Sequence, residues 1–558
     1  MINFRNHPQL AEVVIPSCIN LINNNFSNSF NNMQNLVISE FNHPNILNMV
    51  GSCNNCVNLI SSPVCGDKVT NMYGAYTNCW NITSPPVCGL NVKSMVRAYY
   101  NCINLTGSPV CGNNVQEMSS SYSNCTNLTG SPVCGANVYD MSYAYNNCYN
   151  LTGSPVCGNN VMYMAWTYMY CYNITGSPVC GDRVTTMENT YRNCTNLTGS
   201  PVCGPNVTNM SATYRDCSNL TGSPVCGSNV TNMGQTYNNC QNLTGSPVCG
   251  DKVTNMFYTY YKCYNLTGSP VCGNNVTTML FAYGSCRNLT GSPVCGHNVV
   301  NMQSTYSGCY NLTGSPVCGN NVTNMATTYI NCKNLTGSPV CGNNVTCMLK
   351  TYEECSNISG SPVCGNNVTT MANTYAFCTN LTGSPVCGNN VTTMFSTYFN
   401  CFNLTGSPVC GPNVTNMAYT YYGCSNLSAG NHYFYSPNVA NAAYCFRGKN
   451  SSRRYNVHVP ANSTTLNTFL ISNANSLIGD VITWTNAGAY YYNTAYNIYI
   501  YPEEEQKEEI DDTKKAILID FEYIDNGDGT VIITDWKQTY QGQPSTECII
   551  PKYNWIKL

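Results

Sequence analysis

The 558-residue sequence predicts a repeat solenoid, in which short units wind into successive coils around one core, followed by a small β module at the C-terminus. Three observations lead to this prediction. A 23-residue unit recurs sixteen times without an insertion. Two cysteine positions recur at that 23-residue interval, one from Cys65 to Cys410 and one from Cys79 to Cys424. One Val, one Met and one Tyr position recur at the same interval. A unit this short cannot bury its apolar side chains alone, but stacked copies can bury them together.

The unit at residues 197–219, LTGSPVCGPNVTNMSATYRDCSN, shows how each coil is expected to fold. We expect Leu-Thr-Gly-Ser-Pro-Val-Cys to form one parallel β-strand per coil, with Thr198 and Pro201 facing outward. Val, Met and Tyr then follow at intervals of 0, +3 and +7, which indicates a short helical or 3₁₀ arc. The side chains predicted to face the core are Leu197, Val202, Val207, Met210, Tyr214 and Cys217, with Ser200 as a small filler.

The flanking sequences predict caps and a tail. Residues 1–56 contain degenerate repeats that would cap the solenoid of residues 57–428. Residues 429–501 form the C-terminal cap, with strands expected at 455–460, 480–485 and 496–501. The segment 502–516, PEEEQKEEIDDTKKA, is a charged linker, and 517–558 is a small module whose Asn-Gly-Asp-Gly sequence predicts a β-hairpin.

Composition and charge exclude several classes of protein. Only 8% of residues are charged and the net charge is −3, so no basic surface for nucleic acid is expected. No apolar stretch is long enough to insert into a membrane, and the first residues lack the apolar segment of a signal peptide. The five histidines are scattered and no pair of acidic residues recurs, so we predict neither a catalytic site nor a cofactor.

Cysteine dominates the candidate chemistry, because 32 of the 38 cysteines fall in the two repeated positions. A zinc site would need a second pair beside the single Cys53-x-x-Cys56, so no metal site is predicted. Disulfides between neighbouring coils would require side chains that converge rather than run parallel. We therefore favour two rows of buried thiols that pack as small hydrophobic groups.

One position in the repeat varies freely, and it carries the candidate binding residues. Its occupants, in chain order, are Trp80, Ile103, Thr126, Tyr149, Tyr172, Thr195, Ser218, Gln241, Tyr264, Arg287, Tyr310, Lys333, Ser356, Thr379, Phe402 and Ser425. Free variation beside invariant positions indicates exposure to solvent, and aromatic faces can stack on sugar rings. The candidate ligand-binding residues are therefore the six aromatic ones: Trp80, Tyr149, Tyr172, Tyr264, Tyr310 and Phe402. The alternative is that exposed tyrosine is simply common in a tyrosine-rich chain.

The spacing of Met210, Tyr214, Cys217, Leu220 and Val225 resembles the BspA-like leucine-rich repeat and the related bacterial surface-protein repeat VTNMxxMFxxCxxLTxLDLS. The chain departs from that pattern at Ser200 and Cys203. The resemblance implies a leucine-rich-repeat-like solenoid and an adhesin-like protein of the cell surface, with a ligand on the concave strand face.

A second resemblance concerns the C-terminal segment VHVPANSTTLNTFL…VITWTNAG…YYYNTAYNIYIYP, which is similar to repeat proteins encoded by gut bacteriophages. Together these features predict a non-enzymatic protein that binds a host-cell surface protein or a glycan, carried on a phage virion or a bacterial surface. The alternatives are a structural spacer or decoration protein without a ligand of its own and, less favoured, a polysaccharide depolymerase. The oligomeric state is left open.

Overall fold

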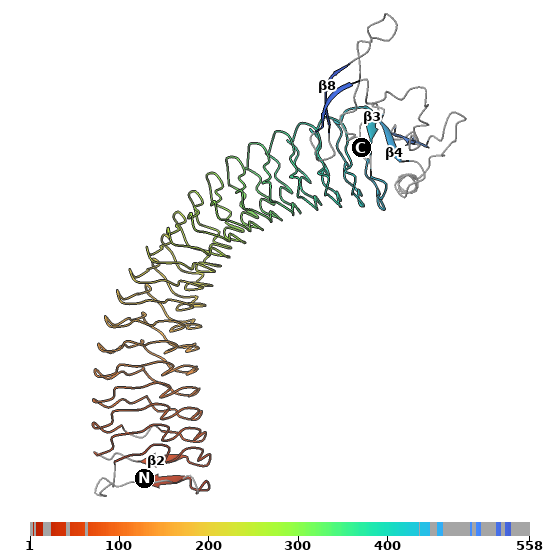
Figure 1. Cartoon of the computed structure of the whole chain (residues 1–558). Coiled ribbons are helices and arrows are strands. Elements are labelled where there is room, and N and C mark those ends of the chain that lie inside the picture. The colour runs from red at the N-terminus through yellow and green to blue at the C-terminus, as the bar shows by residue number, and fades with distance from the viewer. Residues whose placement is uncertain are drawn as a thin grey trace, which may run out of the picture.

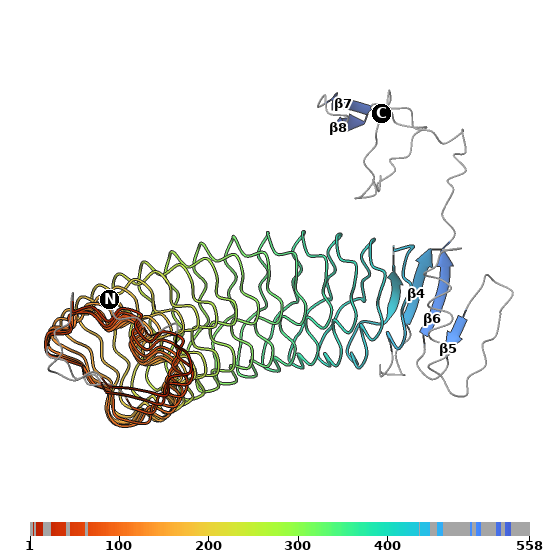
Figure 2. The same cartoon turned by 90° about the horizontal axis from the view of Figure 1, so that it is seen from below.

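The computed structural model describes residues 4, 7–14, 24–40, 45–61, 65–434, 436–446, 455–460, 491–493, 498–503, 521–525 and 531–536. Figure 1 shows the described coils stacked one on another into a curved rod, with the N-terminal coils at one end and strands β3 and β4 at the other. Seen from below, the coils follow one another in register along the rod (Figure 2). The predicted leucine-rich-repeat-like solenoid is confirmed.

The core runs continuously along the rod. The repeated Leu, Val, Met, Tyr and second-position Cys side chains are all completely buried, as in Leu197, Val207, Met210, Tyr214 and Cys217. The tyrosine rings stack directly on one another, with centroids 5.6 Å apart between Tyr191 and Tyr214 and again between Tyr214 and Tyr237. This stack extends from Tyr76 to Tyr421, so each coil buries its apolar surface only against its two neighbours.

Hydrogen bonds between coils are concentrated on the segment from Val207 to Cys217. Isolated parallel bridges link the residue before each Met, such as Asn209 and Asn232, from Asn25 to Asn441. Just before this bridge the amide of Thr208 donates to the preceding coil, and just after it the amides of Met210 and Ala212 donate to the next coil, each over 2.9 Å. The backbone ladder that holds the rod together therefore runs beside the Met column.

The predicted helical or 3₁₀ arc is instead a run of tight turns. Ala212 and Asp216 have left-handed backbone angles, φ 52° and 63°, and every regular coil repeats these two positions. The amides of Thr213, Arg215 and Cys217 donate to carbonyls three residues back, while the two amides that alternate with them donate to the next coil. Because amides alternate between their own coil and the next, no continuous helix can form.

The predicted strand at Leu-Thr-Gly-Ser-Pro-Val-Cys is absent from the regular coils. Gly199 has φ 79° and Pro201 has no amide hydrogen to donate to a ladder. Only the Thr198 amide of this segment donates to the preceding coil, to the Gly176 carbonyl over 2.9 Å, and the backbone around Val202 is held from inside its own coil. The Tyr214 hydroxyl donates to the Val202 carbonyl over 2.7 Å and accepts from the Val202 amide over 3.0 Å.

The predicted set of core side chains needs three corrections. Ser200 is exposed rather than inward, Pro201 is buried rather than outward, and Val202 is only half-buried. All three follow from the loss of strand geometry, because alternate residues point to opposite faces only in an extended strand. Sequence reasoning also missed a buried Thr, such as Thr213, whose hydroxyl donates to the Met187 carbonyl over 2.9 Å.

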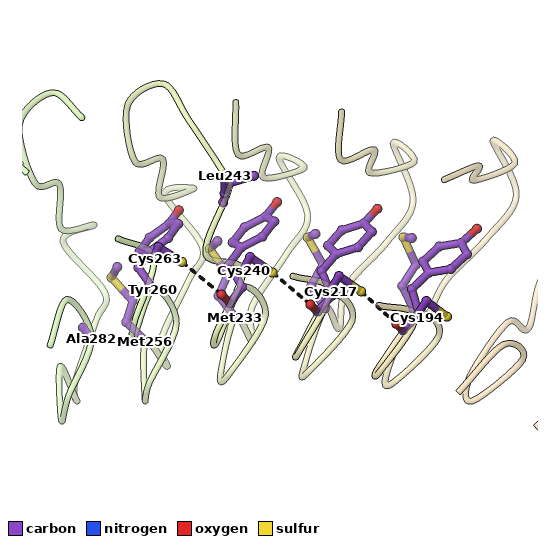
Figure 3. Close-up of a cluster of buried hydrophobic side chains, with 14 of the residues drawn as sticks. Cys194, Cys217, Met233, Cys240, Leu243, Met256, Tyr260, Cys263 and Ala282 are labelled. Atoms are coloured by element: carbon purple, nitrogen blue, oxygen red, sulfur yellow. Dashed lines mark hydrogen bonds between the residues drawn. The ribbon is translucent and has the colours of Figure 1, made fainter. Parts of the chain in front are cut away.

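The two cysteine rows have different partners. From Cys102 onward, each thiol of the second row donates to a tyrosine carbonyl of the preceding coil, as Cys217 Sγ does to Tyr191 over 2.9 Å. Figure 3 shows Cys194, Cys217, Cys240 and Cys263 in line beside the stacked tyrosines. First-row thiols lie over the glycine of the next coil. A Cβ added at Gly227 would stand 2.9 Å from Cys203 Sγ, so the glycine following each cysteine makes room for sulfur.

Strands are present at the two ends. β1 (Glu12–Val14) pairs in parallel with β2 (Ile38–Glu40) at the N-terminal end. At the C-terminal end β3 (Gly430–Tyr433), β4 (Tyr455–Pro460), β6 (Ile498–Glu503) and β5 (Tyr491–Asn493) form a mixed sheet in that order. β2 and β3 occupy the segment that reads Gly-Ser-Pro in the regular coils, and neither contains that sequence.

Two of the three strands predicted in the C-terminal cap are confirmed as β4 and β6, and the third, at 480–485, lies outside the described residues. β6 continues two residues into the predicted linker 502–516, whose other residues also lie outside that set. β7 (Phe521–Asp525) and β8 (Val531–Trp536) pair antiparallel, as expected for the predicted hairpin.

Candidate binding surface

The variable position forms one row along the rod, which we call the corner row: residues 80 to 425 at intervals of 23, each directly after a buried second-row cysteine. Because that cysteine is fixed in the core by its hydrogen bond, the next side chain is turned outward. Five of the six predicted aromatic residues are exposed, with fractional exposures from 38% for Tyr310 to 46% for Trp80. Tyr264 is only half-buried, which corrects the expectation that the whole row is open to solvent.

The structure brings some of these residues together and leaves others apart. Tyr149 and Tyr172 occupy consecutive coils, and their ring centroids are 5.4 Å apart at an angle of 32°. Trp80 lies three coils before this pair and Phe402 four coils after Tyr310, each beside non-aromatic members of the row. Four of the six predicted residues therefore form one aromatic pair and two separate rings. The other two, Tyr264 and Tyr310, have charged neighbours in the row.

A third group occupies four consecutive coils and alternates aromatic and basic side chains: Tyr264, Arg287, Tyr310 and Lys333. The Arg287 guanidinium lies 4.8 Å from the centre of the Tyr264 ring and 5.9 Å from that of Tyr310. Lys333 Nζ lies 5.9 Å from the Tyr310 ring. Arg287 covering its ring explains why Tyr264 is half-buried. Cation–ring contacts of this kind stabilise by about 0.5–1 kcal/mol at exposed sites.

A second set of aromatic residues lies on the run of turns. In some coils the first left-handed position carries an aromatic residue. These residues are Tyr143, Trp166, Tyr258, Phe281, Tyr419 and, beyond the regular repeats, Tyr444. These residues occur in consecutive coils and stack in pairs, with centroids 5.4, 4.5 and 5.0 Å apart. The sequence places those of the regular repeats, among them Trp166 and Tyr258, two positions before the repeated Tyr. It could have revealed the pairing through their recurrence at one position of adjacent units.

The first-row thiols are only partly accessible, and burial governs their chemistry. Burial raises the pKa of Cys134 to about 11 and that of Cys111 to about 12. At neutral pH these groups are therefore protonated thiols, and the thiolate is the form that attacks electrophiles and binds metals. No disulfide joins the cysteines of the described residues, and Cys56 of the Cys-x-x-Cys pair donates to the Phe30 carbonyl over 2.9 Å.

Within the described part of the chain no three His, Cys, Asp or Glu side chains gather into a potential metal site. The same part contains no helix with the length and hydrophobicity that crossing a lipid bilayer requires.

Comparison with known proteins returned matches among solved structures. No protein-family model and no curated protein matches the chain. It is similar to a leucine-rich repeat protein from Bacteroides ovatus, with 13% identity and a TM-score of 0.25 over 80% of this chain and 87% of the other. It is also similar to a leucine-rich cell surface protein from Faecalibacterium prausnitzii, with 12% identity and a TM-score of 0.29 over 67% and 86% of the two chains.

Proposed function

We propose that this chain is a non-enzymatic binding protein, carried on a bacterial surface or a phage virion, that attaches to host-cell or glycan ligands through the corner row. The observation that carries the proposal is the contrast between neighbouring positions. The cysteine before each corner residue is completely buried and never changes, whereas the corner residue changes from coil to coil and is aromatic six times in sixteen.

Repetition explains how such a surface would hold its ligand. Exposed aromatic rings offer flat apolar faces that suit sugar rings, and one such contact is weak. A row of contacts on a rod whose coils stand in fixed register converts later binding events into intramolecular ones, which raises the overall affinity. The aromatic pair of Tyr149 and Tyr172 and the group from Tyr264 to Lys333 would act as separate contact points for one extended ligand or for many copies of a short one.

The test compares two sets of four tyrosines. The first variant replaces Tyr149, Tyr172, Tyr264 and Tyr310 with Ala. The matched control replaces Tyr73, Tyr139, Tyr143 and Tyr163, which are 37–44% exposed at other positions of the coil. Binding to a glycan array and to intact bacterial cells should fall at least about tenfold in the first variant only. Unchanged binding in the first variant would contradict the proposal and favour a structural spacer.

Two further measurements address the remaining parts of the proposal. Purified protein should leave a bound polysaccharide at its original chain length; shortening of the polymer would indicate a depolymerase instead. Antibodies against the solenoid should label intact bacteria or purified virions, and labelling of neither would contradict display at a surface.

A further inference from the structure

We infer that the four-coil row Tyr264–Arg287–Tyr310–Lys333, here called the mixed row, binds acidic polysaccharide, meaning sugar polymers that carry carboxylate groups. The inference rests on the proposed function, since it names the ligand class of one part of the corner row. It adds that the basic residues, and not the rings alone, select the ligand.

Both cations of the mixed row lack an acidic partner. The described residues contain two salt bridges, Arg215 with Asp216 and Lys350 with Glu353, and neither involves Arg287 or Lys333. Both side chains are exposed. The whole sequence has 25 acidic and 22 basic residues, so it contains enough acidic residues to pair with these two charges. Instead, both remain available to a negatively charged ligand.

The rings orient the cations for this task. The Arg287 guanidinium lies over the Tyr264 ring at 4.8 Å and over the Tyr310 ring at 5.9 Å, and its fork of N–H groups suits donation to a carboxylate. Arginine combines ring stacking and paired donation better than any other side chain. Lys333 adds a point charge two coils further along the row. Tyr310, which is 38% exposed between them, offers the surface on which a sugar ring can lie.

The arrangement discriminates among anionic ligands. Nucleic acid binding depends on many phosphate contacts made by a basic surface, and this chain has a net charge of −3. An acidic peptide would use the charges but not the flat rings. A uronic-acid polymer uses both, because it presents one ring and one carboxylate per residue along a line.

The experiment compares two polymers that differ only in charge: polygalacturonate and the same polymer after reduction of its carboxyl groups to alcohols. We expect the full chain to bind polygalacturonate at least about tenfold more tightly at low salt, since two exposed charge contacts each contribute a few-fold. The preference should weaken as salt is added. Poly-glutamate serves as a probe that has charge but no sugar ring, and it should bind more weakly than polygalacturonate.

Two double variants each remove two positive charges, one from the mixed row and the other from outside the corner row. R287Q/K333Q should abolish the preference for polygalacturonate. The control R183Q/K252Q removes the same charge from exposed side chains outside the corner row, which donate to Asn160 over 3.0 Å and to Asn229 over 2.7 Å. It should retain the preference within about twofold.

Three results would overturn the inference: equal binding of the two polymers, an equal loss in both variants, or equal binding of poly-glutamate and polygalacturonate. They are distinguishable from a failure of the proposed function. If the chain binds the neutral polymer or intact cells through Tyr149 and Tyr172 but shows no preference for acid, the proposed function stands and the mixed row is not acid-selective. If it binds neither polymers nor cells, both are wrong.

Discussion

The tyrosine hydroxyls give the sharpest test of how the coils are held together. Replacing Tyr237 with Phe removes one oxygen atom and leaves the ring in its stack. That oxygen donates to the Val225 carbonyl over 2.7 Å and accepts from the Val225 amide over 2.9 Å. In a regular coil it stands where a neighbouring strand would otherwise pair with this segment. We therefore expect the change to loosen the segment around Val225 while the tyrosine stack stays intact.

The magnitude follows from the two hydrogen bonds. Each contributes about 1 kcal/mol net, and a backbone group left without a partner costs about 1–3 kcal/mol when it is fully buried. Val225 is half-buried, so water can reach it and the lower end applies. The expected local loss is about 2 kcal/mol, which corresponds to a roughly thirtyfold rise in the population of the opened segment.

Hydrogen exchange is the suitable assay, because a long repeat array does not unfold in one cooperative step and has no single unfolding free energy. Peptides covering 221–227 should exchange roughly thirtyfold faster in Tyr237→Phe, while those covering 230–240 change little. Tyr149→Phe, which deletes the same atom from an exposed side chain, is the control and should exchange as the wild type does. Unchanged exchange at 221–227 would refute the role assigned to the hydroxyl.

Three other predictions follow from the coil geometry. Arg97→Gly should stabilise its own coil by up to about 1 kcal/mol, measured by hydrogen exchange of peptides around residue 97, because Arg97 is exposed at φ 54°; a helical arc would instead give a local loss of about 1 kcal/mol. Gly227→Ala should destabilise its coil by about 1–3 kcal/mol in the same assay, and Cys203→Ala in the same chain should restore part of the protection by removing the sulfur that stands 2.9 Å from the new methyl group. Burial raises the pKa of Cys134 from 9.0 to about 11, so its alkylation by iodoacetamide at pH 8 should be about a hundredfold slower in the native than in the unfolded chain. The folded state holds that proton more tightly, so the stability that the protonated thiol contributes is complete below pH 9 and is lost as the pH rises toward 11; equal alkylation rates in the two states would contradict the assignment.

The fold class and most of the core could be predicted because a strict period makes every invariant position repeat the same environment. Leu197, Val207, Met210, Tyr214 and Cys217 were identified in this way, and all five are completely buried. The period gives no information on the backbone conformation between these positions. The repeat unit predicts a strand over Leu-Thr-Gly-Ser-Pro-Val-Cys, but Pro201 cannot donate to a ladder and Gly199 adopts a positive φ.

The run of turns illustrates a different limit. Intervals of 0, +3 and +7 between Val207, Met210 and Tyr214 suit a helix, but they suit a chain of turns equally well when left-handed residues intervene. The second left-handed position is often Asn, as at Asn193 and Asn239, and Asn tolerates that conformation. At the first left-handed position Trp166 and Arg97 also adopt a positive φ, although neither Trp nor Arg favours that conformation. Hydrogen bonds to the next coil impose these angles, and those bonds cannot be read from one unit.

The variation of the corner row predicts its exposure, but the residue type at each single position does not show which members of the row act together. In a solenoid of fixed period, residues i and i+23 are neighbours, so the row is one surface whose meaning depends on order. Tyr149 beside Tyr172 makes an aromatic pair, whereas Tyr264 beside Arg287 makes a cation resting on a ring. A tyrosine at this repeat position thus forms one of two kinds of site, depending on the corner residue of the next coil. If the proposed function holds, the order of residues along the row selects the ligand. Exchanging Arg287 with Ser218, without changing composition, should then abolish the preference for polygalacturonate, because position 218 lies between Thr195 and Gln241 and has no ring beside it.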